Sequence, residues 1–381
     1  MSKREEVLRL SDRLAAERRA ARPVVATLHD RLAAAWDADL PSSWQTVGMV
    51  QELVVAADDT LEKDPSLSRD LAQFAVAVAT AIAPRTYPRP ILAQAEGQAW
   101  RQVGVAHRYM SNYAAAIRAL DAAHRIVAGA GVLQHDEAIV ELARAVVFNE
   151  QNRHDEALRL VKELSAVFAE FGDQRRSVQC SLVEGMIYQR RGELRAARTT
   201  YEDALSVAKQ TDDLHTIGAI LLNLAQVYSA LGEVSMAAAQ LQEARELFAG
   251  LQMPTEVTRT DFALGRVLVE HGQHLKAIGI LRSVRERFLE RRMIEEAGLA
   301  ALDMVDALVA TDDRKSAQVL TETVILEFRA AGLNERALTA LAYLRDLLPT
   351  HPTPQQPIRH VRSYLEQLRT EHVRAFLPLP E

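Results

Sequence analysis

The feature that most constrains this chain is an alanine that returns every 40 residues through its middle and C-terminal parts. Self-similarity at a fixed period of 20 to 50 residues is typical of a solenoid, in which each unit buries its apolar surface only against its neighbours. Because such a core grows in one dimension, the length of 381 residues sets no domain count. The recurring alanines are Ala157, Ala197, Ala237, Ala277 and Ala317, with Ala116 one residue out of step.

The composition favours helix throughout. The sequence is 48% hydrophobic, 25% charged and only 5% aromatic, and its abundant alanine and leucine are strong helix formers. The 13 prolines and 16 glycines fall at the apparent ends of elements. No run alternates apolar and polar residues as a half-buried strand does. The sequence therefore predicts an all-α protein.

The charge distribution, the cysteine content and the lack of targeting signals limit the classes of partner and the cellular compartment. The net charge of −6 is spread as interspersed acids and bases, which argues against nucleic acid or a membrane surface as the partner. A single cysteine, Cys180, excludes an intrachain disulfide and fits a reducing compartment. The N-terminus has no signal-peptide core, and no stretch is apolar enough to span a membrane. We expect a cytoplasmic protein, and the excess of arginine over lysine favours a bacterial source.

Each repeat has the pattern of a first helix, a tight turn and a second helix. The clearest example lies within residues 180–210, where Gly185 and Tyr188 occupy the first helix and Gly192 the turn. Ala197 and Tyr201 then share one face of the second helix at a spacing of four. The turn position holds residues that tolerate or cap a tight turn. It is occupied by Ser111, Asn152, Gly192, Gly232, Gly272 and Asp312.

This pattern resembles the tetratricopeptide repeat over about residues 97–330. It departs from that family in length, because the basic unit has about 34 residues and this one has 40. The surplus follows the last alanine of the second helix, so each helix can reach about 16 residues. The resemblance implies a right-handed α-solenoid of antiparallel helix pairs that binds proteins or peptides. Repeats of 40 residues are familiar in bacterial peptide sensors and signalling scaffolds.

The repeat register predicts three regions. Residues 1–88 form an N-terminal helical region, which is either a cap, the favoured interpretation, or a separate small bundle, and whose last two helices resemble a degenerate repeat. Residues 89–348 form about six to seven repeats, and 349–381 form a proline-rich link, a capping helix and a tail. The expected N-terminal helices end at Pro23, Pro41, Pro65 and the Pro84/Pro88 pair. The expected helices outside the repeats are Arg4–Ala21, Pro23–Ala38, Ser43–Leu61, Leu67–Ile82, Leu333–Leu348 and Pro357–Thr370.

No residue constellation predicts chemistry. The 11 histidines form no metal-binding spacing, and His107 occupies a position where the repeat packs a ring. Acid pairs such as Asp312-Asp313 fall where they cap helices, and Cys180 fits a small packing residue. There is no phosphate loop or nucleophile motif. We therefore expect no enzyme activity, no cofactor and no catalytic or metal site.

The resemblance also implies a binding groove lined by the first helices. Its amides and guanidinium groups suit an extended backbone or a carboxylate. The mid-helix amides of Asn149, Asn223 and Gln226 are the strongest hint, because amides add no helix propensity. The groove positions are Arg101, Arg108, Tyr109, Asn149, Glu150, Met186, Gln189, Arg190, Asn223, Gln226, Arg259, Phe262, Arg266, Asp303 and Asp306.

Two functions fit these features. The first is a non-catalytic scaffold or adaptor that holds a peptide or a partner segment in the groove. The alternative is a peptide-sensing regulator similar to bacterial pheromone receptors, whose N-terminal helical region contacts a response regulator or another effector. A monomer is favoured, and a dimer through the apolar stripe of a terminal helix is the competing assembly.

Overall fold

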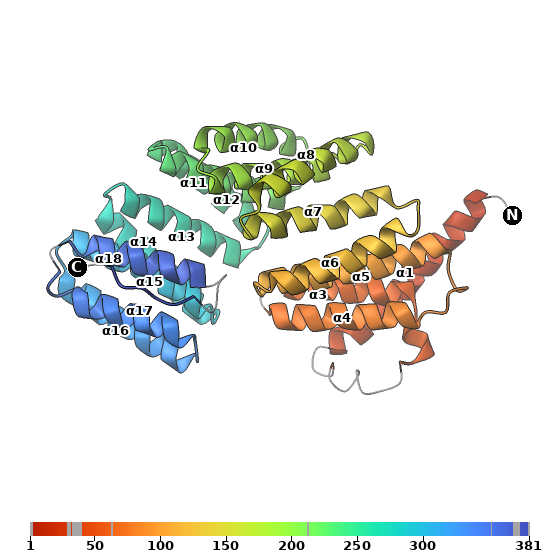
Figure 1. Ribbon diagram of the computed structural model, residues 1–381, viewed down its shortest axis with the longest axis horizontal. Helices are drawn as coiled ribbons and strands as arrows, with labels where there is room; N and C mark the ends of the chain where they lie inside the picture. Colours follow the sequence, from red (N-terminus) through yellow and green to blue (C-terminus); the bar gives the residue numbers. More distant parts are fainter. Residues whose placement is uncertain are drawn as a thin grey trace. The chain divides into compact units, whose positions relative to one another are not determined.

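A computed structural model describes residues 3–28, 32, 40–61, 64–211, 213–351, 353–368 and 374–379. These residues form α-helices and one short 3-10 helix, Ser42–Trp44, and contain no strand (Figure 1). The expected all-α fold of antiparallel helix pairs is confirmed. None of the helices described is both long and apolar enough to cross a membrane.

The chain divides into two compact units, residues 1–187 and 188–381. The boundary falls within α9 (Gln174–Arg190). Unit 1 contains α1 (Lys3–Leu28), α3 (Val47–Thr60) and α4 (Pro65–Ala81), then the pairs α5 (Arg89–Tyr109) with α6 (Tyr113–Ala128) and α7 (Gln134–Glu150) with α8 (His154–Glu170). Unit 2 contains α10 (Leu194–Ala208) and the pairs α11 (Leu214–Ala230) with α12 (Val234–Gly250), α13 (Pro254–Glu270) with α14 (His274–Glu290) and α15 (Ile294–Ala310) with α16 (Arg314–Ala330), then α17 (Glu335–Leu347) and α18 (Gln355–Leu368).

The turn inside each pair has one fixed backbone conformation. All six residues at the predicted turn position adopt a positive φ, which glycine reaches without strain and asparagine and aspartate tolerate best. This confirms the register read from the alanines, because a register shifted by one residue would assign different residues to the turn position. The φ values are 55° for Ser111, 60° for Asn152, 75° for Gly192, 80° for Gly232, 76° for Gly272 and 63° for Asp312.

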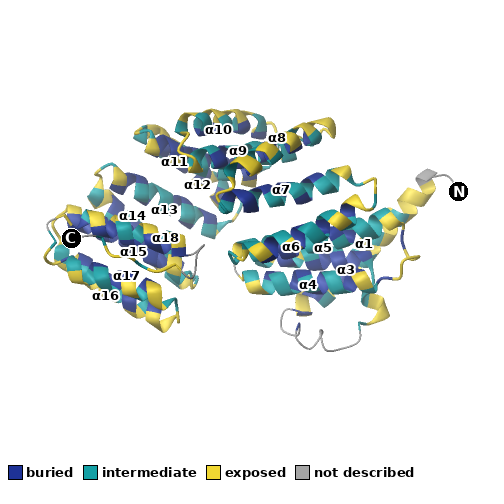
Figure 2. Ribbon diagram, in the orientation of Figure 1, coloured by how far each residue is buried: buried dark blue, intermediate teal, exposed yellow. Residues whose placement is uncertain are grey.

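The recurring alanines pack where the helices of a pair cross. All of them, Ala116 included, are completely buried. Glycines of the first helices also face side chains of the second helix of their pair. A Cβ atom on Gly218 would lie 2.4 Å from Cζ of Phe248, and one on Gly265 would lie 2.5 Å from Cδ2 of Leu281. Small residues on both helices therefore set the close approach, while the outer faces of the second helices stay exposed (Figure 2).

The N-terminal helices share one apolar core with the first repeat. Leu53 of α3 and Phe74 of α4 belong to the same buried cluster as Ala99 of α5. The predicted break at Pro23 is wrong, because α1 continues through this residue. One proline removes a single backbone hydrogen bond, and the neighbouring buried side chain of Val25 holds the helix against the cluster. Most of the expected second helix lies outside the described residues.

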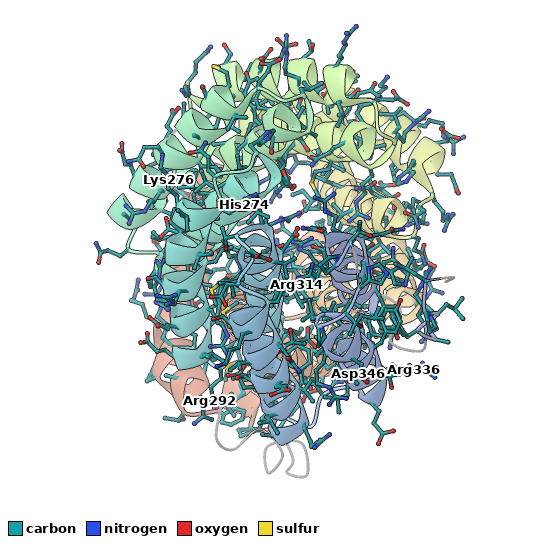
Figure 3. The ribbon with its side chains drawn as sticks, turned by 90° about the vertical axis from the view of Figure 1, so that its left-hand side faces the viewer. His274, Lys276, Arg292, Arg314, Arg336 and Asp346 are labelled. Atoms are coloured by element: carbon teal, nitrogen blue, oxygen red, sulfur yellow. The ribbon has the colours of Figure 1, made fainter. Side chains whose placement is uncertain are left out.

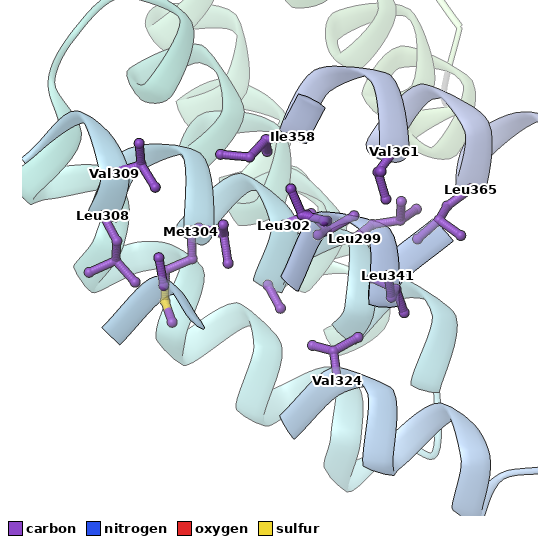
Figure 4. Packing of buried hydrophobic residues seen from close by; sticks show 14 of the residues in the cluster. Leu299, Leu302, Met304, Leu308, Val309, Val324, Leu341, Ile358, Val361 and Leu365 are labelled. Carbon is purple, nitrogen blue, oxygen red and sulfur yellow. The ribbon is translucent and has the colours of Figure 1, made fainter. Parts of the chain in front are cut away.

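The C-terminal helix α18 packs against α15 and α17 through an apolar stripe. Ile358, Val361 and Leu365 point into the cluster that also holds Leu299 and Leu341 (Figure 4). The helix therefore covers the last repeats, as a capping helix does.

The segments on both sides of α18 also contact neighbouring helices. Arg314 at the start of α16, labelled in Figure 3, donates from Nη1 to the backbone oxygen of His351 at 3.1 Å. Phe376 in the tail packs edge-on to Tyr364, with ring centroids 5.0 Å apart.

Candidate functional site

The first helices of unit 2 carry equivalent side chains at intervals of 40 residues, and these differ sharply in exposure. Gln226 on α11 is exposed, Arg266 on α13 is partly exposed, and Asp306 on α15 is only 9% exposed. The cause is α18, which occupies the side of α15 turned away from α16. Gly298 of α15 faces α16, and Asp303, five residues later, is rotated from it by about 140° and faces α18. The surface of the first helices is thus open along α11 and α13 and covered at α15.

The open part forms a cleft of about 220 Å³, which we call the Gln226 cleft. Two amides meet at its edge, because Nε2 of Gln189 donates to Oε1 of Gln226 at 3.2 Å. The hydroxyl of Tyr201 donates to Oε1 of Gln189 at 3.2 Å, which fixes the orientation of that amide. The cleft is lined by Gln189, Ala225, Gln226, Ser229, Ala230, Leu241, Ala263, Arg266, Val267 and Glu270.

A serine, a glutamate and a histidine lie together at one side of this cleft. Oγ of Ser229 donates to Oε2 of Glu270 at 2.7 Å, and Nε2 of His271 lies 3.3 Å from the same Oγ. In a nucleophile triad the carboxylate holds the imidazole, and the imidazole takes the hydroxyl proton. Here the carboxylate accepts from the hydroxyl itself, so this arrangement is a polar network and not a triad.

A second cleft of about 330 Å³, the Asp303 cleft, lies where α18 meets α13 and α15. The guanidinium of Arg362 donates to both carboxylate oxygens of Asp303, with Nη2 to Oδ2 at 3.2 Å. Arg359 lies 3.7 Å from Asp306. The two clefts share Arg266 and Glu270 and are therefore contiguous. The Asp303 cleft is lined by Arg266, Val269, Glu270, Asp303, Asp306, Arg359 and Arg362.

Burial controls the electrostatics of the covered aspartates. It raises the pKa of Asp303 above its ordinary value, against the attraction of Arg362 and Arg266. It also raises the pKa of Asp306, against the attraction of Arg359. For Arg362, burial lowers the pKa, but attraction to Asp303 outweighs it and leaves the pKa raised. The predicted groove residues Asp303 and Asp306 are therefore engaged within the protein, because α18 supplies arginines to both.

Three of the groove residues predicted in unit 1 come together. Nη1 of Arg108 donates to Oε1 of Glu150 at 2.9 Å, and the same guanidinium lies 4.5 Å from the ring centroid of Tyr109. Asn149, in contrast, is completely buried and does not line an open surface. Its Oδ1 lies 3.0 Å from Nδ1 of His154 at the start of α8, which gives this amide a structural role. Met186 is partly buried.

The other predicted residues of unit 2 are dispersed. Arg190 is exposed, and Nδ2 of Asn223 donates to the backbone oxygen of Ala219 in its own helix at 2.9 Å. Arg259 pairs with Glu256 one turn earlier, at 2.8 Å. Phe262 packs edge-on to Phe288 of α14, with ring centroids 6.0 Å apart, and so contributes to the core of its repeat.

Four polar or charged residues that line the two clefts were not among the predicted groove residues. Ser229 and Glu270 follow the last groove position of their helices, where the family pattern assigns no contact. Arg359 and Arg362 lie on α18, far along the sequence from the aspartates they approach. Their spacing of three residues on the polar side of an apolar stripe is the only sequence signal for a charged contact.

Comparison with known proteins agrees with this architecture. The tetratricopeptide repeat family matches residues 180–249, and no curated protein matches the chain. A Rap protein complexed with competence and sporulation factor is 13% identical over 95% of this chain and 99% of that chain, with a TM-score of 0.60. Aspartyl phosphate phosphatase F from Bacillus subtilis is 12% identical over 100% and 98%, with a TM-score of 0.55. The Rap conjugation gene regulator of plasmid pLS20, in complex with the Phr* peptide, is 16% identical over 87% and 98%, with a TM-score of 0.52.

These solved structures share the fold of stacked helix pairs with this chain. Residues 180–249 match tetratricopeptide repeats, and the chain as a whole has a tetratricopeptide-like helical fold.

Proposed function

We propose that this protein is a non-catalytic interaction scaffold of the cytoplasm that binds a peptide or a partner segment in the Gln226 cleft. The observation that carries the proposal is the open, polar stretch of the first helices at α11 and α13. Next to it, the same surface is covered by α18. A ligand that follows the first helices would therefore reach this stretch and end at Arg266.

The side chains of the cleft suit an extended peptide. The amide of Gln226 both donates and accepts hydrogen bonds, as the backbone of an extended chain requires. The guanidinium of Arg266 and the carboxylate of Glu270 offer opposite charges at one end. Ala225, Val267 and other apolar side chains form the floor. Apolar surface with a few convergent polar groups is the usual composition of a ligand site.

A steric block tests this proposal. We expect Gln226→Trp to fill the cleft and to lose the partner that the full chain retains when it is isolated from its native cell. Leu275→Trp is the matched control, because Leu275 on α14 is 79% exposed and lies outside both clefts. Equal recovery of the same partner by both variants would contradict binding in the Gln226 cleft.

A second candidate function is a peptide-responsive regulator. Two similar structures are Rap proteins complexed with a peptide or factor, and the similarity to one extends over 95% of this chain. An effector surface would then lie in the N-terminal helices, and α1 exposes the apolar side chains of Val7 and Leu8, at 66% and 56%. Exposed apolar side chains are typical of contact surfaces.

This candidate predicts two separable partners. Leu8→Glu should abolish binding of an effector protein and leave the peptide bound, whereas Gln226→Trp should abolish peptide binding. If Leu8→Glu leaves every partner of the full chain bound, the simple scaffold is the better account.

A further inference from the structure

The tail segment 374–379 lies against α17 and α18 without helix or strand structure. Phe376 and Leu379 are partly buried. Leu377, in contrast, is 74% exposed, and Pro378 is exposed as well. Most side chains of the tail therefore face solvent, and the tail contacts the protein through a small number of groups.

The ring of Phe376 lies among three aromatic side chains, which we call the Phe376 site. The ring centroids are 5.3 Å apart for Tyr343 on α17, 5.4 Å for His360 and 5.0 Å for Tyr364, both on α18. His360 and Tyr364 are four residues apart and so share one side of their helix. Edge-on ring pairs at these distances are favourable beyond the apolar area that they bury.

The two α18 side chains of the site also hydrogen-bond to the backbone of the tail. The hydroxyl of Tyr364 donates to the backbone oxygen of Arg374 at 2.8 Å. Nε2 of His360 lies 2.8 Å from the backbone oxygen of Leu377. Because a carbonyl oxygen only accepts, this imidazole nitrogen carries the proton and donates it.

Proline gives the tail the extended form that these bonds require. Pro378 has a fixed φ, and it restricts the residue before it, Leu377, to extended conformations. An extended segment of this kind has no internal hydrogen bonds, so its backbone groups are available to other side chains. One such group is the N–H of Leu379, which donates to the hydroxyl of Tyr343 at 3.2 Å.

These contacts suit an occupant that can leave the site. Tyrosine and histidine combine an apolar ring with a polar atom that water can satisfy, so the Phe376 site tolerates exposure when the tail departs. The backbone bonds are the same for any sequence, and the exposed side chain of Leu377 adds little. Recognition therefore depends on an extended segment with phenylalanine two residues before proline, which another protein can also supply.

We propose that the Phe376 site is a second docking surface, which binds an extended segment of a partner protein that has phenylalanine two residues before proline. The tail is then an internal ligand that competes with this partner. The inference goes beyond the Gln226 cleft, because it places a different partner segment on α17 and α18. A segment tethered to its own site competes at an effective concentration of about 1 mM.

Fluorescence anisotropy of a labelled hexapeptide tests the site. The probe has the sequence of residues 374–379 and is titrated with the full chain and with its Phe376→Ala variant, whose tail lacks the docking ring. We expect saturable binding to both. For a peptide with a Kd of about 0.1 mM, the competing tail should weaken binding to the parent about tenfold relative to the variant.

Two altered peptides check the recognition without altering the protein. A peptide with Phe376→Ala should not bind, because it lacks the ring that lies in the site. A peptide with Leu377→Ser should bind within about twofold of the probe, because that side chain faces solvent.

One hydroxyl of the site gives a readout that a merely structural tail would not produce. Tyr364→Phe, added to the Phe376→Ala chain, keeps the ring and removes one hydrogen bond, so it should weaken probe binding about 2- to 10-fold. Tyr109→Phe, on α5 in unit 1, is the matched control and should leave the affinity unchanged. Circular dichroism confirms that each variant keeps the helix content of the parent.

Three results would overturn the proposal. The first is no binding of the probe to the parent at millimolar concentration, a measurement that needs no variant to fold. The second is equal binding of the Phe376→Ala peptide. The third is a concentration-dependent dimer of the parent that Phe376→Ala abolishes, since the site would then exchange tails between two copies of this chain.

The test is independent of the Gln226 cleft. Gln226→Trp should bind the probe as the parent does, because its substitution lies on α11. If Gln226→Trp loses its partner and the probe never binds, the scaffold function stands and only the Phe376 site fails.

Discussion

Replacement of Asp303 by alanine would leave Arg362 without its buried partner between α15 and α18. The side chains of this pair are 9% and 13% exposed, so solvent screens it weakly. Removing one partner of a buried pair costs about 3–5 kcal/mol, because the remaining charge stays in a poorly solvated site. Arg362 retains Glu366 at 3.0 Å, so we expect the lower end, about 3 kcal/mol. We expect this cost to lower the free energy required for local opening of α18 by the same amount.

Hydrogen exchange measured by mass spectrometry on peptides from α18 reports this opening. A loss of about 3 kcal/mol corresponds to roughly 100-fold faster exchange, at about 1.4 kcal/mol for each factor of ten. Asp306→Ala is the matched control one turn away. Its partner Arg359 is 73% exposed and stays solvated, so exchange should accelerate less than about fivefold. The double variant Asp303→Leu with Arg362→Met should return to within about tenfold of the parent. Equal exchange in Asp303→Ala and Asp306→Ala would refute the reasoning.

Three further predictions concern packing, turns and the thiol. Gly218→Ala should lower the free energy of unfolding in urea by about 1–3 kcal/mol, because the new methyl group meets Phe248. Gly279→Ala, with nothing within 4 Å, should raise it by about 0.5–1 kcal/mol, and the opposite order would contradict the helix crossing. Asp312→Gly should raise the Tm, since φ is 63° there, and a lower Tm would show that the aspartate side chain matters more than the turn. Burial raises the pKa of Cys180 to about 12, so at pH 8 only about one thiol in 10⁴ is ionised. Labelling with a disulfide reagent should therefore require unfolding, and rapid labelling of the native chain would contradict this burial.

The repeat register could be predicted because the same constraints on side-chain size and turn conformation act in every helix pair. Ala197 and its equivalents must be small where two helices cross, and Gly232 and its equivalents must accept a positive φ. Both constraints act within one helix pair, so they leave a periodic trace in the sequence. The six turn conformations confirm the constraint on φ, and the recurring alanines are completely buried.

The covering of α15 could not be predicted, because it depends on where a distant helix docks. The apolar stripe of Ile358, Val361 and Leu365 predicts that α18 packs against an apolar surface. It does not predict which helices form that surface. The register placed Asp303 and Asp306 correctly on the first helix. It could not show that Arg362 and Arg359 of α18 lie against these two aspartates. The assignment of Asn149 to the groove was wrong because its burial also depends on a neighbouring helix. An amide in mid-helix is equally useful to a ligand and to a buried neighbour, here His154.

The central claim is that a ligand contacts the first helices of unit 2 at the Gln226 cleft. The most direct measurement is photocrosslinking in the native cell, with benzoylphenylalanine placed at position 226 and, as the control, at position 275. We predict a crosslinked peptide or protein at position 226 that is absent at position 275 and absent when Arg266→Glu is added. The same product at both positions, or a product at position 275 alone, would contradict the account.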